Sequence, residues 1–368
     1  AMLRFNGSSQ DTPIDQDNYV YGNGAGVGDV YLYSSAYDIQ RDVWSGELQL
    51  QGNLTVFGRP ANLAVGVDRS DLDYSRSNAA IQLGVANIYD ENFSDFPTAE
   101  PIPSSTGLTD TQDTGFYGQF QFRPFERLSM LLGGRYDISK SESTYLDSLT
   151  DDILSTDEQE DKDFTGRVGL TFDVTDRISV YGLYAQSFEP TSSVDESGNI
   201  LDPETGETWE AGIKTEWLDG RLGVNAALFR IERDDVAIPD PTNGPGEFDS
   251  ITAGLQRSDG LELEINGEPL PGWNLSFGGI LLDSKFTERD DPFFGSTPGG
   301  AADWQIGLFT SYELQDGLLK GFGLGTGLFA IDDRGVSSFV PGAELEGYER
   351  VDLSAFYSGF RPVKIALQ

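Results

Sequence analysis

The sequence contains no cysteine and no histidine among its 368 residues. Without cysteine, the chain can form neither a disulfide framework nor a thiolate metal site. Without histidine, Ser-His and Cys-His catalysis is excluded, as are zinc and haem sites with histidine ligands. Carboxylate pairs, lysine nucleophiles and tyrosine chemistry remain available, as in glycosidases. Most enzyme chemistries are therefore closed to this chain.

Long apolar runs and basic residues are also scarce. No window holds the roughly eighteen consecutive apolar residues of a membrane helix, which excludes a helical membrane protein. Lys and Arg number 24 against 61 Asp and Glu, for a formal net charge of −37. This charge argues against nucleic acid or an anionic membrane surface as partner, although a saline habitat produces the same excess. The first residues carry no basic segment followed by an apolar one, so we expect no signal peptide there.

The clearest pattern runs from Trp209 to Arg233 and predicts a β-hairpin. An Asp-Gly pair at 219–220 supplies the positive-φ positions of a tight turn. Before the turn, apolar and charged side chains alternate with the period of a strand. The apolar face carries Trp209, Ala211, Ile213, Thr215 and Trp217, and the other face carries Glu210, Gly212, Lys214 and Glu216. The two tryptophans are expected about 20 Å apart along a barrel axis, near the ~25 Å apolar band of outer-membrane barrels, so we predict that this face contacts lipid.

The same layout recurs along the chain. Short turns alternate with longer polar connections, as periplasmic turns and extracellular loops do in bacterial outer-membrane barrels. A soluble sandwich has no reason to place every long loop at one end. We predict an all-β fold, an antiparallel transmembrane β-barrel with about fifteen strands in a single domain over 1–368. One long strand is expected over 29–57, and the polar segments 6–28, 71–113 and 141–163 are expected to be loops.

Motifs from Ser187 onward resemble those of TonB-dependent ferric-siderophore receptors. They are SF.P at 187–190, L.PE.G...E.G.K at 201–214, ALF.I.R..V...DP at 227–241 and G..RS.G.E.E..G....GW.L at 254–275. The resemblance covers about half of the chain. It implies a fragment of a twenty-two-stranded barrel, from which the N-terminal plug domain, the TonB box and the closing C-terminal strand are absent.

The resemblance also implies a function. The chain would be part of a receptor in the outer membrane of a Gram-negative bacterium, a transporter and not an enzyme, that takes up ferric siderophores. It implies no cofactor, because the ferric siderophore is cargo. The implied partners are the TonB-ExbB-ExbD complex, reached through the plug and the TonB box, and outer-membrane lipid, but not nucleic acid. A siderophore is preferred to haem because no histidine is present.

Two other functions remain open. The chain could form a passive, porin-like channel without a plug. It could also be a secreted acidic β-protein that binds or cleaves carbohydrate, in which case the apolar faces would form an internal core. Solubility without detergent would distinguish that protein from a barrel.

Aromatic residues in the predicted loops are candidates for contacting a flat, partly apolar chelate. The resemblance implies that such residues form the ligand pocket together with plug residues, and two arginines could pair with an anionic siderophore. The candidates are Tyr89, Phe93, Phe96, Phe248, Phe293, Phe294 and Phe339, with Arg289 and Arg334.

Charged positions within the motifs have a structural interpretation. We expect Glu204, Glu210, Lys214, Arg257 and Glu262 to face inward and to pair across adjacent strands, which fixes the register. The acidic run at 147–163 lacks the spacing of a Ca²⁺-binding loop. We therefore predict a solvated extracellular loop for that run.

Overall fold

The computed structural model describes residues 2–21, 29–87, 99–191, 193–197, 199–240, 242, 250–288, 293–336, 344–359 and 365–367. In these ranges the chain forms a 15-stranded sheet and two 2-stranded sheets. All the pairings in these sheets are antiparallel. Among the same residues, no helix has the length and apolar character needed to cross a membrane. The predicted all-β fold and the number of strands are confirmed.

The strands of the large sheet lie in space in the order in which they occur in the chain. They are β1 (Met2–Tyr21), β2 (Asp29–Val56), β3 (Arg59–Asn87), β4 (Ile102–Phe125), β5 (Leu128–Asp147), β6 (Ile153–Thr175), β7 (Ile178–Glu189), β8 (Glu204–Trp217), β9 (Leu222–Asp234), β12 (Gln256–Leu270), β13 (Trp273–Phe286), β14 (Trp304–Glu313), β15 (Phe322–Ile331), β18 (Tyr348–Tyr357) and β19 (Ile365–Leu367). The small sheets pair β10 (Val236–Pro239) with β11 (Ser250–Ala253) and β16 (Arg334–Gly335) with β17 (Glu344–Leu345).

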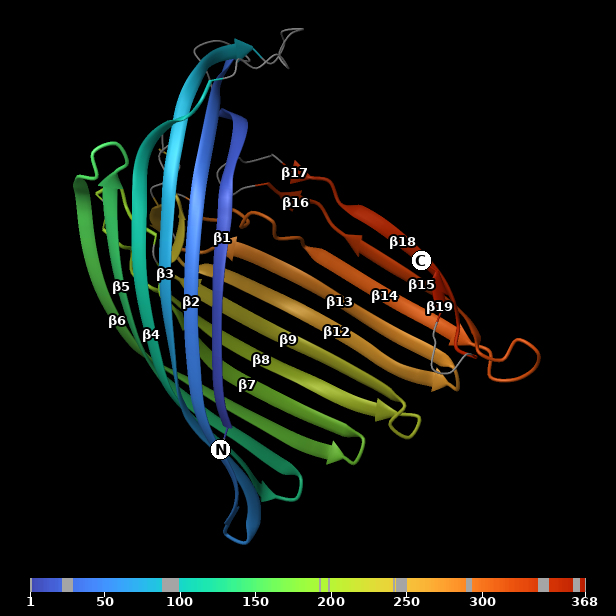
Figure 1. The fold of residues 1–368 in the computed structure, drawn as a ribbon. Coiled ribbons are helices and arrows are strands. Elements are labelled where there is room, and N and C mark those ends of the chain that lie inside the picture. Colours follow the sequence, from blue (N-terminus) through green and yellow to red (C-terminus); the bar gives the residue numbers. More distant parts are fainter. Residues whose placement is uncertain are drawn as a thin grey trace.

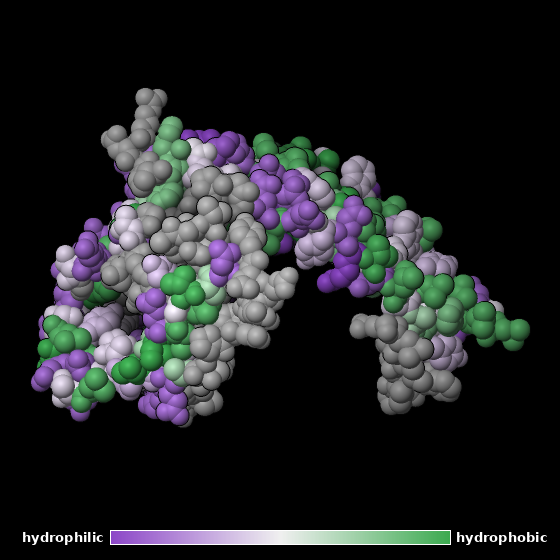
Figure 2. All heavy atoms as spheres, turned by 90° about the horizontal axis from the view of Figure 1, so that it is seen from above, coloured by the Kyte–Doolittle hydropathy of each residue, from purple (hydrophilic) through white to green (hydrophobic). Residues whose placement is uncertain are grey.

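The large sheet curves into an open arch. Figure 1 shows a curved wall that runs from β1 to β18, and Figure 2 shows the arch from above. Among the described strands, β1 and β19 each pair on one side only. The described part of the barrel therefore has two edges, as expected for an incomplete barrel wall.

The hairpin of β8 and β9 has the predicted turn and the predicted faces. Leu218, Asp219 and Gly220 have φ angles of 54°, 59° and 82°. Ile213 lies directly opposite Ala226, and partners in an antiparallel pair share one face. Trp217 at one end of the outer face is 51% exposed, which fits a surface that contacts lipid rather than an internal core.

The outer-face indoles near the turns are held by hydrogen bonds within the sheet. Trp217 Nε1 donates to Thr215 Oγ1 at 2.8 Å, and Trp273 Nε1 donates to Thr310 Oγ1 at 2.7 Å. Interfacial tryptophans usually place one apolar and one wet end at a membrane boundary. These two rings therefore mark the turn side of the apolar band.

Three predicted loops are largely strand, so those predictions were wrong. Segment 6–21 belongs to β1, β3 continues to Asn87, β4 starts at Ile102, and β5 and β6 leave only 148–152 as a turn. Residues 22–28 and 88–98 lie outside the described residues. Period-two alternation identifies a strand only where one of its faces is apolar. The strand segments that were predicted as loops extend beyond the apolar band and carry polar side chains on both faces. Hydroxyl pairs support them, including Thr109 with Ser143 and Thr144 with Thr156, at 3.3 Å each.

The acidic run at 147–163 is mostly strand, and it holds a neighbouring loop in place. Asp157 on β6 accepts the backbone N–H of Ile200 at 2.9 Å, and Gln159 donates to the carbonyl of Leu201 at 3.2 Å. Ile200 is buried, with 9% of its surface exposed. These contacts hold the connection between β7 and β8 against the wall.

Replacing Asp157 with alanine is expected to loosen residues 199–201. Loss of one charge-assisted hydrogen bond should speed amide exchange at Ile200 about tenfold, which corresponds to about 1.4 kcal/mol. Hydrogen exchange read by mass spectrometry measures this. Glu158→Ala on the opposite face of the strand is the control, and equal exchange in the two variants would contradict the anchoring role.

Candidate functional site

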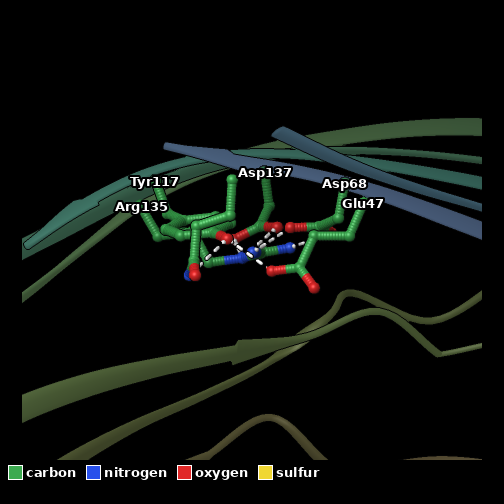
Figure 3. Close-up of polar contacts among 6 residues, drawn as sticks. Glu47, Asp68, Tyr117, Arg135 and Asp137 are labelled. Carbon is green, nitrogen blue, oxygen red and sulfur yellow. Dashed lines mark hydrogen bonds and ion pairs between the residues drawn. The ribbon is translucent and has the colours of Figure 1, made fainter. Parts of the chain in front are cut away.

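The concave face of β2 to β5 carries a cluster of charged side chains, which we call the inner-wall network. It contains Glu47, Asp68, Tyr117, Arg135 and Asp137. Arg135 donates from its two terminal nitrogens to both oxygens of Asp68 at 2.7 and 2.8 Å, and from Nε to Asp137 at 2.8 Å. The Tyr117 hydroxyl donates to Glu47 at 2.5 Å. Figure 3 shows these side chains projecting from the wall toward the strands across the arch.

Two glycines make room for this network. Gly115 lies between Asp68 and Asp137 in the register, and an added Cβ would lie 1.9 Å from Arg135 Nη2. Arg135 can therefore cross the backbone of β4 to reach Asp68 on β3. Gly66 plays the same part for Tyr117, whose ring would lie 2.4 Å from an added Cβ. Both glycines are needed for a close approach of a long side chain to the backbone.

A hollow of about 700 Å³ lies beside the network. Its lining includes Glu47, Asp68, Tyr117 and Arg135 of the network, and also Arg167. Pockets of about 300 to 1,000 Å³ are typical of small-molecule sites. The hollow has charges of both signs, so it can receive a polar ligand or another polar protein segment.

The inner wall farther along the sheet follows the predicted pairing. Arg233 donates to both oxygens of Glu204 at 2.5 and 2.7 Å. The Tyr181 hydroxyl donates to Glu210 at 2.5 Å, and the Lys214 ammonium lies 4.8 Å from the centre of the Tyr181 ring. The predicted pairing of charges across strands is confirmed for Glu204, whereas Glu210 and Lys214 make their cross-strand contacts with the neutral Tyr181. Glu262 lies directly opposite Ala227 in the register.

The predicted inward orientation of Arg257 was wrong. Arg257 does form a cross-strand pair, with its Nε 2.7 Å from Glu232. However, Arg257 lies on the same face of β12 as Leu261. Leu261 lies directly opposite Leu228, which is on the outer face and 63% exposed. A second pair on this face, Arg230 with Asp259 at 2.6 Å, lies beside it. The prediction placed Arg257, near the loop end of β12, on the inner face. The two ion pairs instead lie on the outer face, beyond its apolar band.

The predicted ligand residues are only partly described. Tyr89, Phe93, Phe96, Phe248, Arg289 and Phe339 lie outside the described residues. Phe293 is 8% exposed and packs in a cluster with Val236, Ala253 and Phe286 at the base of the loops. Phe294 is exposed. Arg334 lies in β16, and its buried Nε has no hydrogen-bond partner among the described residues. The structure does not bring Phe293 and Phe294 to the inner-wall network, and their ligand role stays a prediction.

Several carboxylates surround Asp235, which lies in the connection between β9 and β10. Burial, followed by the charges of Asp234, Asp202 and Glu288, raises the pKa of Asp235. Asp234 ends β9, and Asp235, Asp202 and Glu288 belong to three different connections. Negative charge is therefore concentrated around Asp235.

The sequence prediction did not identify the inner-wall network or Arg167. The sequence does contain a usable signal. On β5, Arg135 and Asp137 lie on the face opposite to that of the apolar Leu132 and Tyr136, and Arg135 lies directly opposite Tyr117 in the register. Counting parity from the apolar face would have placed them on the inner wall. Arg135 binds Asp68, 67 residues away, and Tyr117 binds Glu47, 70 residues away, and no local pattern shows these contacts.

The family model described as "TonB dependent receptor-like, beta-barrel" matches residues 3–367. Among curated proteins, the "Ferrichrome outer membrane transporter/phage receptor" of Escherichia coli (strain K12) is 29% identical over 296 residues, which cover 77% of this chain and 38% of that protein. The "Ferripyoverdine receptor" of Pseudomonas aeruginosa is 30% identical over 293 residues, 74% of this chain and 33% of that protein. This chain thus spans well under half the length of both relatives.

Solved structures show the same fold. The ferripyoverdine receptor of the outer membrane of Pseudomonas aeruginosa, bound to ferripyoverdine, superposes with a TM-score of 0.76 at 23% identity, over 99% of this chain and 48% of that one. The siderophore receptor PiuA of Acinetobacter baumannii gives a TM-score of 0.73 at 20% identity, over 99% and 57%. At these identities the likeness concerns the fold alone.

Proposed function

Because this chain belongs to the family of TonB-dependent receptor-like β-barrels, we propose that it forms most of the wall of an outer-membrane receptor for ferric siderophores. The observation that supports this proposal best is the two-faced sheet, with an exposed apolar outer face and a charged inner wall, in a chain whose relatives are named as ferrichrome and ferripyoverdine receptors. The chelate would be cargo, and the protein would be a receptor rather than an enzyme.

The edges of the sheet support a larger assembly. Unpaired backbone groups in lipid cost several kcal/mol each, so the edges of β1 and β19 require partners. We propose that further strands of the whole receptor pair with both edges and close the barrel. A plug would then lie inside the barrel and would connect it to the TonB-ExbB-ExbD complex. The complete barrel would lie in the outer membrane of a Gram-negative bacterium.

Iron uptake by cells tests the proposal. Deleting the gene in its own host should abolish uptake of ⁵⁵Fe from at least one ferric siderophore, and restoring the whole gene should recover it. Uptake through the restored receptor should also be lost when TonB is deleted, because opening a plugged barrel requires energy from the inner membrane. Uptake that continues without TonB would instead show a passive channel.

A further inference from the structure

Arg167 differs in its partners from the other two arginines that line the hollow, Arg69 and Arg135. Arg69 pairs with Asp71. The charge of Arg135 is compensated by Asp68 and Asp137. Arg167 is exposed, and its guanidinium donates to the amide oxygen of Gln119. In the described part of the chain, no carboxylate lies within ion-pair distance of Arg167.

The wall holds Arg167 in a defined position. Gly133 on β5 lies directly opposite Arg167 in the register, and an added Cβ there would lie 2.7 Å from Arg167 Nε. The side chain therefore lies flat across the backbone of β5 and reaches Gln119 on β4. An arginine fixed at one end by a glycine contact and at the other by a neutral amide keeps its charge available to a ligand.

The rest of the hollow fits a ligand that carries an anionic group. Glu47 lies on β2 and its carboxylate accepts from Tyr117, whereas Arg167 lies on β6. Arg167, which has no carboxylate partner, and the carboxylate of Glu47 thus lie on opposite sides of the 700 Å³ hollow. The lining also includes Gln49 beside Glu47 on β2 and Thr165 beside Arg167 on β6, and both carry hydrogen-bonding groups. An anionic oxygen would be drawn to the β6 side.

We propose that Arg167 binds an anionic oxygen group, such as a free carboxylate, at the edge of the ferric chelate. This inference rests on the proposed function and assigns a binding residue to the receptor's ligand site. A guanidinium and a carboxylate form two parallel hydrogen bonds, and Arg167 supplies the planar donor for them. A carboxylate from another segment of the receptor has the same chemistry, and the experiment separates the two sources.

The test uses the whole receptor, purified in detergent, and two ferric hydroxamate chelates that differ in a free carboxylate. Quenching of tryptophan fluorescence gives Kd for the wild type, Arg167→Gln, Arg167→Lys and Lys162→Gln. Lys162 is the control because it lies on the same strand, on the opposite face, and pairs with Glu160. Arg167→Gln should weaken binding of the carboxylate-bearing chelate about 10- to 100-fold, and Arg167→Lys should weaken it less. Lys162→Gln, and all variants with the other chelate, should stay within about threefold.

Other outcomes overturn the inference in distinct ways. Equal affinities for Arg167→Gln and Lys162→Gln would show that the ligand does not contact Arg167. A lower melting temperature of the ligand-free Arg167→Gln receptor, with unchanged affinities, would show that a carboxylate of the receptor is its partner. Failure of the wild type to bind any ferric chelate would contradict the proposed function itself, and not only the role of Arg167.

Discussion

Replacing Ile213 with arginine is expected to destabilise the barrel by about 2 to 4 kcal/mol, the cost of an arginine that faces lipid near the middle of the membrane. Ile213 lies midway between Trp209 and Trp217 on β8, and its side chain is on the exposed apolar face. The cost arises because the guanidinium must leave water or pull water and headgroups into the apolar band. Urea unfolding of the complete receptor in lipid vesicles measures the effect.

Gln51→Arg is the matched control for this substitution. It also introduces one positive charge on a long strand, but Gln51 alternates with the exposed Leu50 and so faces the interior of the arch. An arginine there stays in water, and the change in unfolding free energy should be below about 0.5 kcal/mol. Equal losses at Ile213 and Gln51 would mean that the sheet does not have one lipid face and one aqueous face.

The alternation of side chains explains which parts of the fold could be predicted from the sequence. The hairpin at Asp219 and Gly220 was predicted correctly because one face of β8 and β9 is apolar, the other is polar and the turn residues are specific. The extensions of β3 and β6 could not be recognised, because both of their faces are polar above the membrane. Hydroxyl pairs and backbone ladders maintain these strands, and neither leaves a periodic signal.

The candidate site was harder to predict than the fold for a different reason. Arg135 binds Asp68, which is 67 residues away, because β3, β4 and β5 lie side by side and Gly115 has no side chain between them. The sequence shows the glycine and the charges but not the register that aligns them. The loop aromatics came from a resemblance to a family, and most of them lie outside the described residues.

The largest effect expected on the inner wall is that of Arg135→Met. Methionine keeps much of the packing but leaves Asp68 and Asp137 without their cation, and breaking a buried pair typically costs about 3 to 5 kcal/mol. Because the side chains of Arg135 and Asp68 are 37% and 33% exposed, solvent screening should reduce the loss to about 2 kcal/mol. Arg123→Met, which removes an exposed pair with Asp173 near the turns, should cost less than about 1 kcal/mol.

A double-mutant cycle can separate the ion pair from the methylene packing of Arg135. In an Asp68→Asn, Asp137→Asn background the carboxylates no longer need compensation, so Arg135→Met should cost about 1 kcal/mol less than it does in the wild type. The unfolding free energies of the four proteins give this coupling directly. No coupling would mean that Arg135 acts only by covering Gly115 and Tyr117. Strong coupling would show that the network fixes the register of β3, β4 and β5. Arg135 on β5 binds Asp68 on β3, across β4, and it binds Asp137 two residues away on its own strand.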